Sequence, residues 1–144
     1  STWGSWTYYD TPQYPYTPNS GVERIYASSQ NDSLITVGHD IVFDGAYFAG
    51  YGPPEATLEF LLYRGGNLVA TSGIIAPSST PQFLASGYSG PVDAINVVAA
   101  DSGYYGAFVM DDLTYHDYQA VPEPASLTVI GLGVLGLLRK RKPL

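Results

Sequence analysis

The groups best suited to acid–base chemistry in this sequence are its two histidines, each followed by an aspartate: His39–Asp40 and His116–Asp117. Neighbouring side chains on a strand point to opposite faces, so adjacency alone does not make a catalytic dyad. The sequence has no nucleophile-elbow, zinc-protease or phosphate-cradling glycine motif. A pair of carboxylates that meets only in the fold would still suffice for glycoside hydrolysis. We therefore expect no enzyme, with a hydrolase as the alternative.

Asp111 and Asp112 are the second chemically distinctive feature, because they are adjacent within a predicted strand over residues 107–115. Strict alternation places one of the two carboxylates on the core-facing side, where an unpaired charge is costly. A Ca²⁺ ion bound by this aspartate and by backbone carbonyl oxygens would compensate that charge. Backbone N–H groups or Arg24 would do the same. The pair is therefore a candidate for a structural calcium site or for a hydrogen-bonded structural role.

Aromatic side chains gather near the beginning of the sequence, between several prolines. Aromatic faces stack on the apolar faces of sugar rings, and tyrosine hydroxyls add hydrogen bonds. We expect Trp3 and Trp6 to cover one end of the folded domain. The candidates for a glycan-binding platform are Tyr14 and Tyr16 in the Pro-rich segment or, alternatively, Tyr104 and Tyr105 in a later loop.

Short strands and turns must position these side chains. Only 13% of the residues are charged, whereas the chain has 16 Gly, 11 Pro and 13 Tyr, a composition typical of strands joined by loops. Alternation places Ala56, Leu58, Phe60 and Leu62 on one face. Strands are predicted at 41–48, 56–63, 68–71, 82–86, 94–99 and 107–115. We expect an all-β domain over residues 1–120, an antiparallel β-sandwich of jelly-roll type.

The charge is distributed unevenly along the chain. The formal net charge is −7, with twelve acidic and two basic residues in 1–120 against one acidic and four basic residues from Val121 onward. An acidic domain repels phosphate backbones, which disfavours nucleic acid as a partner, and we expect none. The chain has no cysteine, so cysteine-ligated metal centres are excluded as well.

The end of the chain, residues 121–144, has three parts in order. Val121 precedes Pro122-Glu123-Pro124, whose prolines favour an extended and accessible backbone. Residues 127–138 are apolar apart from one threonine and favour a helix of about 18 Å, shorter than the roughly 30 Å core of a bilayer. Four cations then form a stop on the cytoplasmic side of a membrane: Arg139, Lys140, Arg141 and Lys142. A helix this short indicates a transient anchor.

This arrangement resembles the PEP-CTERM sorting signal over residues 121–144. The resemblance implies a precursor exported by a Gram-negative bacterium, held in the inner membrane through 127–138 and cut near the Pro-Glu-Pro motif by an exosortase. It assigns Val121 to Pro124 to recognition by that enzyme. The mature form is then expected at the cell surface or outside the cell.

Residues 3–118 also resemble the ectodomain of such proteins, which is similar in fold to carbohydrate-binding modules. Proteins of this kind are commonly associated with exopolysaccharide and biofilm matrix. We therefore expect a non-enzymatic surface or extracellular-matrix protein that binds polysaccharide, without a catalytic cofactor. The alternative is a small secreted hydrolase that acts on matrix glycans. A platform of aromatic side chains without converging carboxylates would favour the binding protein.

Overall fold

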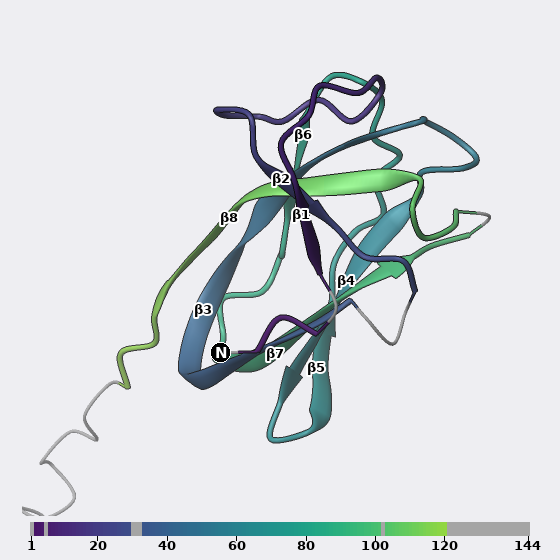
Figure 1. Ribbon diagram of the computed structural model, residues 1–144. Coiled ribbons are helices and arrows are strands. Elements are labelled where there is room, and N and C mark those ends of the chain that lie inside the picture. Colours follow the sequence, from purple (N-terminus) through teal and green to yellow (C-terminus); the bar gives the residue numbers. More distant parts are fainter. Residues whose placement is uncertain (1, 5, 30–32, 102, 121–144) are drawn as a thin grey trace, which may run out of the picture.

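A computed structural model describes residues 2–4, 6–29, 33–101 and 103–120 (Figure 1). This part of the chain is all-β. Its strands are β1 (Thr7–Tyr9), β2 (Arg24–Tyr26), β3 (Leu34–Gly50), β4 (Leu58–Arg64), β5 (Asn67–Thr71), β6 (Gln82–Ala85), β7 (Val92–Ala99) and β8 (Phe108–Asp117). Within the described ranges no helix has the length and hydropathy needed to cross a membrane. The helix predicted at 127–138 lies outside them.

The strands form one antiparallel sheet in the order β1-β2-β8-β3-β7-β4-β5, and β6 also pairs with β3. The long strand β3 connects the two halves of this sheet. Its first part pairs with β7 and its second part with β8 and β6, while Ile41 pairs with both Val92 and Asp117. Figure 1 shows the sharp bend in β3 that lets the sheet turn around its core. The antiparallel all-β class is confirmed, and the jelly-roll sandwich stays a prediction.

The core contains the apolar face predicted for β4. Its four residues are fully buried: Ala56, Leu58, Phe60 and Leu62. The Phe60 ring lies 4.8 Å from Phe43 and 5.6 Å from Phe48, and Phe48 lies 6.0 Å from Phe108. Edge-on and tilted ring pairs of this kind each add about 0.5–1.5 kcal/mol to the burial of their surface. Because Phe108 is the first residue of β8, this chain of rings connects the start of β8 to the core residues of β3 and β4.

The six predicted strands are present, with ends that differ by a few residues. The strand predicted at 41–48 is part of the longer β3, which begins at Leu34. The short strands β1 and β2 were not predicted from the sequence. They pair with each other and bring the amino-terminal segment to β8, through Tyr8↔Ile25 and Ile25↔Met110. The loop between them, residues 10–23, is therefore anchored to the sheet at both ends.

Candidate functional site: a tyrosine-lined cleft

The acidic pair Asp111–Asp112 lies at a β-bulge in β8. On β3, Gly45 pairs with Thr114 and Tyr47 pairs with Asp111, so two residues of β8 lie opposite a single residue of β3. Asp112 has a φ of 46°, in the left-handed region that aspartate and asparagine tolerate better than most residues. A bulge of this kind redirects the side chains that follow it.

The prediction that one of these carboxylates faces the core is wrong. Asp111 is half-buried and Asp112 is exposed, because the bulge breaks the alternation on which the prediction relied. Both carboxylates bind the 10–23 loop instead. Asp111 Oδ2 accepts hydrogen bonds from the backbone N–H groups of Asn19 (2.7 Å) and Ser20 (2.9 Å). Asp112 accepts them from the Asn19 amide (2.8 Å) and the Ser20 hydroxyl (2.8 Å).

The hydrogen-bonded role considered for the pair is therefore present in the fold. Calcium binding by Asp111 and Asp112 stays a prediction from the sequence. In the part of the chain that the structure describes, no three side chains of His, Cys, Asp or Glu gather closely enough to hold a metal ion. A calcium ion at the pair would also have to displace donors from the loop.

Arg24 of β2 holds the two ends of the same loop. Its side chain is buried, with 2% of the residue exposed. The guanidinium donates to the carbonyl oxygens of Thr11 (2.5 Å) and Val22 (3.0 Å), and its central carbon lies 4.6 Å from the centre of the Tyr9 ring. Such cation–π contacts are strongest where the cation is desolvated. The loop is thus held at its ends by Arg24 and near its last third by the acidic pair.

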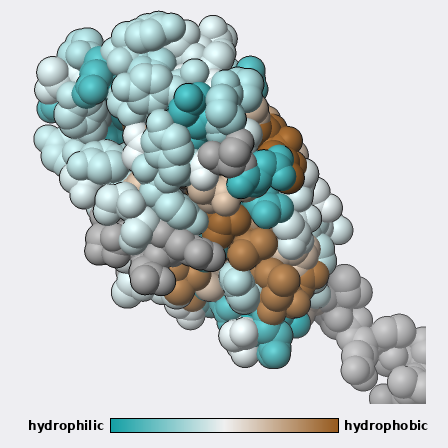
Figure 2. Space-filling model, turned by 90° about the vertical axis from the view of Figure 1, so that its right-hand side faces the viewer, coloured by the Kyte–Doolittle hydropathy of each residue, from teal (hydrophilic) through white to brown (hydrophobic). Residues whose placement is uncertain are grey.

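A cleft of about 220 Å³ lies between this loop and the start of β8. Its lining residues are Tyr9, Gln13, Tyr16, Tyr26, Gly106, Phe108 and Val109. The three tyrosines come from β1, the loop and β2, and none of the lining side chains carries a formal charge. Figure 2 shows the upper end of the molecule as mostly pale, which marks residues of intermediate hydropathy, with hydrophobic side chains gathered lower on the same face.

Tyr16 is fixed from two sides in this cleft. Its hydroxyl donates to the carbonyl oxygen of Gly106 (2.6 Å), and its ring meets Tyr51 edge-on at 5.5 Å. Burial of the phenol and its hydrogen bond with Tyr51 raise the pKa of Tyr16 to about 12. The hydroxyl is therefore neutral at any physiological pH. On the other side, the Tyr9 hydroxyl donates to Gln13 Oε1 (2.7 Å) and orients that amide.

Neither of the two tyrosine pairs predicted as alternative platforms, Tyr14 with Tyr16 or Tyr104 with Tyr105, lies together in the cleft lining. Only Tyr16 lines the cleft. Tyr14 is 82% exposed and Tyr104 is 55% exposed, outside the lining. Tyr105 has a structural role, since its hydroxyl accepts the N–H of Ala99 and its ring packs on the core at Phe108.

Sequence reasoning missed Tyr9, Tyr26 and Gln13. The signal that could have found Tyr9 and Tyr26 is a hydrophobic or aromatic strand pattern. Each of these strands has only three residues and flanks a Pro-rich loop, so such a pattern cannot be recognised there. Of the two tryptophans, Trp6 packs partly buried against the core, whereas Trp3 is 40% exposed.

Two further concave regions carry acidic residues. A groove of about 310 Å³ is lined by Trp3, Tyr8, Glu23, Arg24, Ile25, Met110, Asp111, Asp112, Leu113 and Tyr115. A larger groove of about 810 Å³ crosses β3, β7 and β4, and Tyr63 supplies the single aromatic ring in its lining. Of these three concave regions of the described residues, the tyrosine cleft is the one lined by several aromatic rings without a carboxylate.

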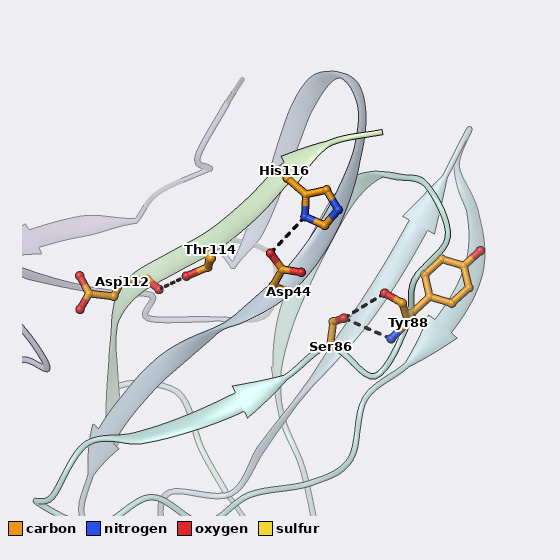
Figure 3. Close-up of polar contacts among 6 residues, drawn as sticks. All are labelled: Asp44, Ser86, Tyr88, Asp112, Thr114 and His116. Carbon is orange, nitrogen blue, oxygen red and sulfur yellow. Dashed lines mark hydrogen bonds and ion pairs between the residues drawn. The ribbon is translucent and has the colours of Figure 1, made fainter. Parts of the chain in front are cut away.

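The histidines pair across strands and not with their neighbours in the sequence. Figure 3 shows His116 of β8 reaching Asp44 of β3, at 3.3 Å, while Asp112 points away from that pair. His39 pairs in the same way with Asp117, at 3.0 Å. All four side chains are substantially exposed, so these contacts are surface pairs on the β3–β8 ladder, away from the cleft lining.

Comparison with known proteins identifies the end of the chain. A family model described as the PEP-CTERM protein-sorting motif matches residues 120–142, and this confirms the sequence-based identification. No curated protein and no solved structure matches the chain. The motif defines an exported protein that is sorted by way of the membrane. Residues 120–142 thus carry a PEP-CTERM sorting motif, and an exosortase is the enzyme that such a motif implies for processing.

Proposed function

We propose that this protein is a non-enzymatic component of the cell surface or extracellular matrix that binds exopolysaccharide through the tyrosine cleft. The cleft is the observation that carries the proposal. Rings from Tyr9, Tyr16 and Tyr26 surround it, and aromatic faces with hydroxyl groups suit the alternating apolar and polar surfaces of sugars. Its volume of about 220 Å³ is below the roughly 300 Å³ at which sites for drug-sized molecules begin, which suits one or two sugar units of a longer chain.

The tethers of the 10–23 loop support this function. A loop that is fixed before the ligand arrives loses less conformational entropy on binding. Arg24, Asp111 and Asp112 hold the loop through hydrogen bonds to four of its residues, and the Tyr16 hydroxyl adds a contact with Gly106. These are the contacts of a preorganised binding surface.

The distribution of carboxylates favours a binding protein over the alternative, a small secreted hydrolase acting on matrix glycans. Glycoside hydrolysis needs two carboxyl groups on opposite sides of the scissile bond. The lining of the tyrosine cleft has none. Glu23, Asp111 and Asp112 line the neighbouring groove, but the last two accept hydrogen bonds from the loop and serve as tethers.

The sorting motif also has consequences for location. We propose that the precursor is held in the inner membrane of a Gram-negative bacterium through residues 127–138 and that the mature protein is released to the surface or beyond. The last strand, β8, ends at Asp117, and only residues 118–121 separate it from Pro122. At about 3.5 Å per residue, cleavage at the motif takes place within roughly 20 Å of the folded domain.

Affinity electrophoresis of the full-length chain in a non-ionic detergent, through gels containing a polysaccharide, tests the binding function. Tyr26→Ala and Tyr16→Ala should each weaken the affinity obtained from the retardation about tenfold, equivalent to about 1.4 kcal/mol of binding free energy. Tyr14→Ala is the matched control, because Tyr14 lies in the same loop but outside the cleft lining. Equal losses for Tyr14→Ala and Tyr16→Ala, or no retardation by any polysaccharide of a broad panel, would refute the proposal. Circular dichroism of each variant separates lost binding from lost folding.

A further inference from the structure

We infer that the tyrosine cleft selects uncharged polysaccharide and rejects polymers that carry carboxylate or sulfate groups. The inference rests on the proposed function and names the ligand class of that same site. It depends on three observations: how the cations of the folded domain are used, where its acidic residues lie, and which polar groups line the cleft.

The cations of the described domain are engaged by the protein itself. Residues 1–120 contain no lysine and two arginines. Arg24 is buried and its guanidinium is directed at backbone carbonyls of the loop. Arg64 lies at the far end of β4 and pairs with Asp40 at 2.6 Å. Sites that recognise carboxylate or phosphate groups typically present an arginine or lysine to them, and neither arginine lines this cleft.

Acidic residues surround the loop that forms the cleft. The loop begins at Asp10, ends at Glu23 and is held by Asp111 and Asp112. Twelve acidic residues against two arginines in 1–120 make the domain as a whole repel a polyanion. At low salt this repulsion reaches far, because the Debye length is about 30 Å at 0.01 M and about 8 Å at 0.15 M.

The polar groups of the cleft suit sugar hydroxyls. They are the tyrosine hydroxyls, the amide of Gln13 and the carbonyl oxygen of Gly106, all of them neutral. The tyrosine phenols are protonated at neutral pH, since their ordinary pKa is near 10, and the pKa of Tyr16 is raised further. Neutral donors and acceptors of this kind exchange hydrogen bonds with water for hydrogen bonds with hydroxyl groups, without desolvating a charge.

Matched polymer pairs that differ in charge test the inference. The full-length chain in non-ionic detergent is run through gels containing hydroxyethylcellulose or carboxymethylcellulose, dextran or carboxymethyl-dextran, and carboxyl-reduced or native alginate. For each polymer pair that the protein binds, its affinity for the uncharged member should be at least about tenfold higher than for the charged member at 10 mM salt. The difference should shrink at 150 mM salt as screening increases. Gln13→Lys, which adds a cation to the cleft lining, should bring the charged member closer to its uncharged partner.

The outcomes separate the inference from the function on which it rests. Equal or stronger retardation by the charged members at 10 mM salt, lost in Tyr26→Ala, overturns the inference and leaves glycan binding at the cleft in place. Retardation by none of the six polymers overturns both. Retardation that Tyr26→Ala does not reduce places binding elsewhere and also overturns the inference.

Discussion

Replacing Asp111 by alanine should loosen the 10–23 loop and lower the stability of the whole domain. The carboxylate accepts three backbone hydrogen bonds, from the N–H groups of Asn19, Ser20 and Asp112. Hydrogen bonds to a charged group contribute about 1.5–3 kcal/mol each where they are buried. These are near the surface, where water can replace the lost acceptor. We therefore count less than 1 kcal/mol for each and expect a decrease of about 2 kcal/mol in the free energy of unfolding.

Urea unfolding of the full-length chain in non-ionic detergent, followed by fluorescence, measures this change. Asp112→Asn is the matched control, since asparagine tolerates the left-handed backbone at this position and keeps one acceptor for the loop. It should cost about 0.5 kcal/mol, in the range of an exposed hydrogen bond. Amide exchange at Asn19 and Ser20 should accelerate in Asp111→Ala but not at β4. A free energy of unfolding within 0.5 kcal/mol of the parent, with unchanged exchange, would show that the pair does not hold the loop.

Three further expectations concern pH, processing and calcium. Because the pKa of Tyr16 is raised to about 12 in the folded state, its contribution to stability is complete below the unfolded value near 10 and is lost as the pH rises toward 12. Tyr16→Phe should therefore lose less stability than the parent between pH 10 and 12 in urea titrations. In a host with an exosortase, the extracellular protein should lack residues 127–144 by intact mass. Alanine at Pro122, Glu123 and Pro124 should leave uncut precursor in the membrane, and mature protein that retains the basic tail would contradict this. A calcium role for the acidic pair requires the melting temperature to rise with Ca²⁺ concentration, whereas tethering alone gives equal melting in Ca²⁺ and in chelator.

The core strands could be predicted because they follow a simple physical pattern. Every second residue from Ala56 to Leu62 is apolar and fully buried, as alternation on a half-buried strand requires. The sorting motif was equally accessible, since its three parts are contiguous in the sequence. Both features can be recognised from residues that are close together in the sequence.

The cleft could not be predicted in the same way, because its parts meet only after distant segments pair. Tyr9 and Tyr26 come together through strands of three residues, too short for any periodic signal. The bulge at Asp112 depends on a positive φ. Aspartate tolerates this conformation, but the presence of an aspartate in the sequence does not predict it. Strict alternation at that point therefore placed a carboxylate in the core, whereas the structure leaves Asp111 half-buried and Asp112 exposed.

The pairing of β8 with β3 determines how the domain would carry a mechanical load. The cleft lies beside the first residues of β8, and the sorting motif begins a few residues after its last residue, Asp117, so β8 lies between the two along the chain. β8 lies lengthwise against β3, from Phe108 opposite Gly50 to Asp117 opposite Ile41. Hydrogen bonds between antiparallel strands are perpendicular to the strands, so sliding β8 along β3 would shear many of them at the same time. Under shear, the hydrogen bonds between two strands resist the force together. Two strands that are pulled apart from one end lose their hydrogen bonds one after another.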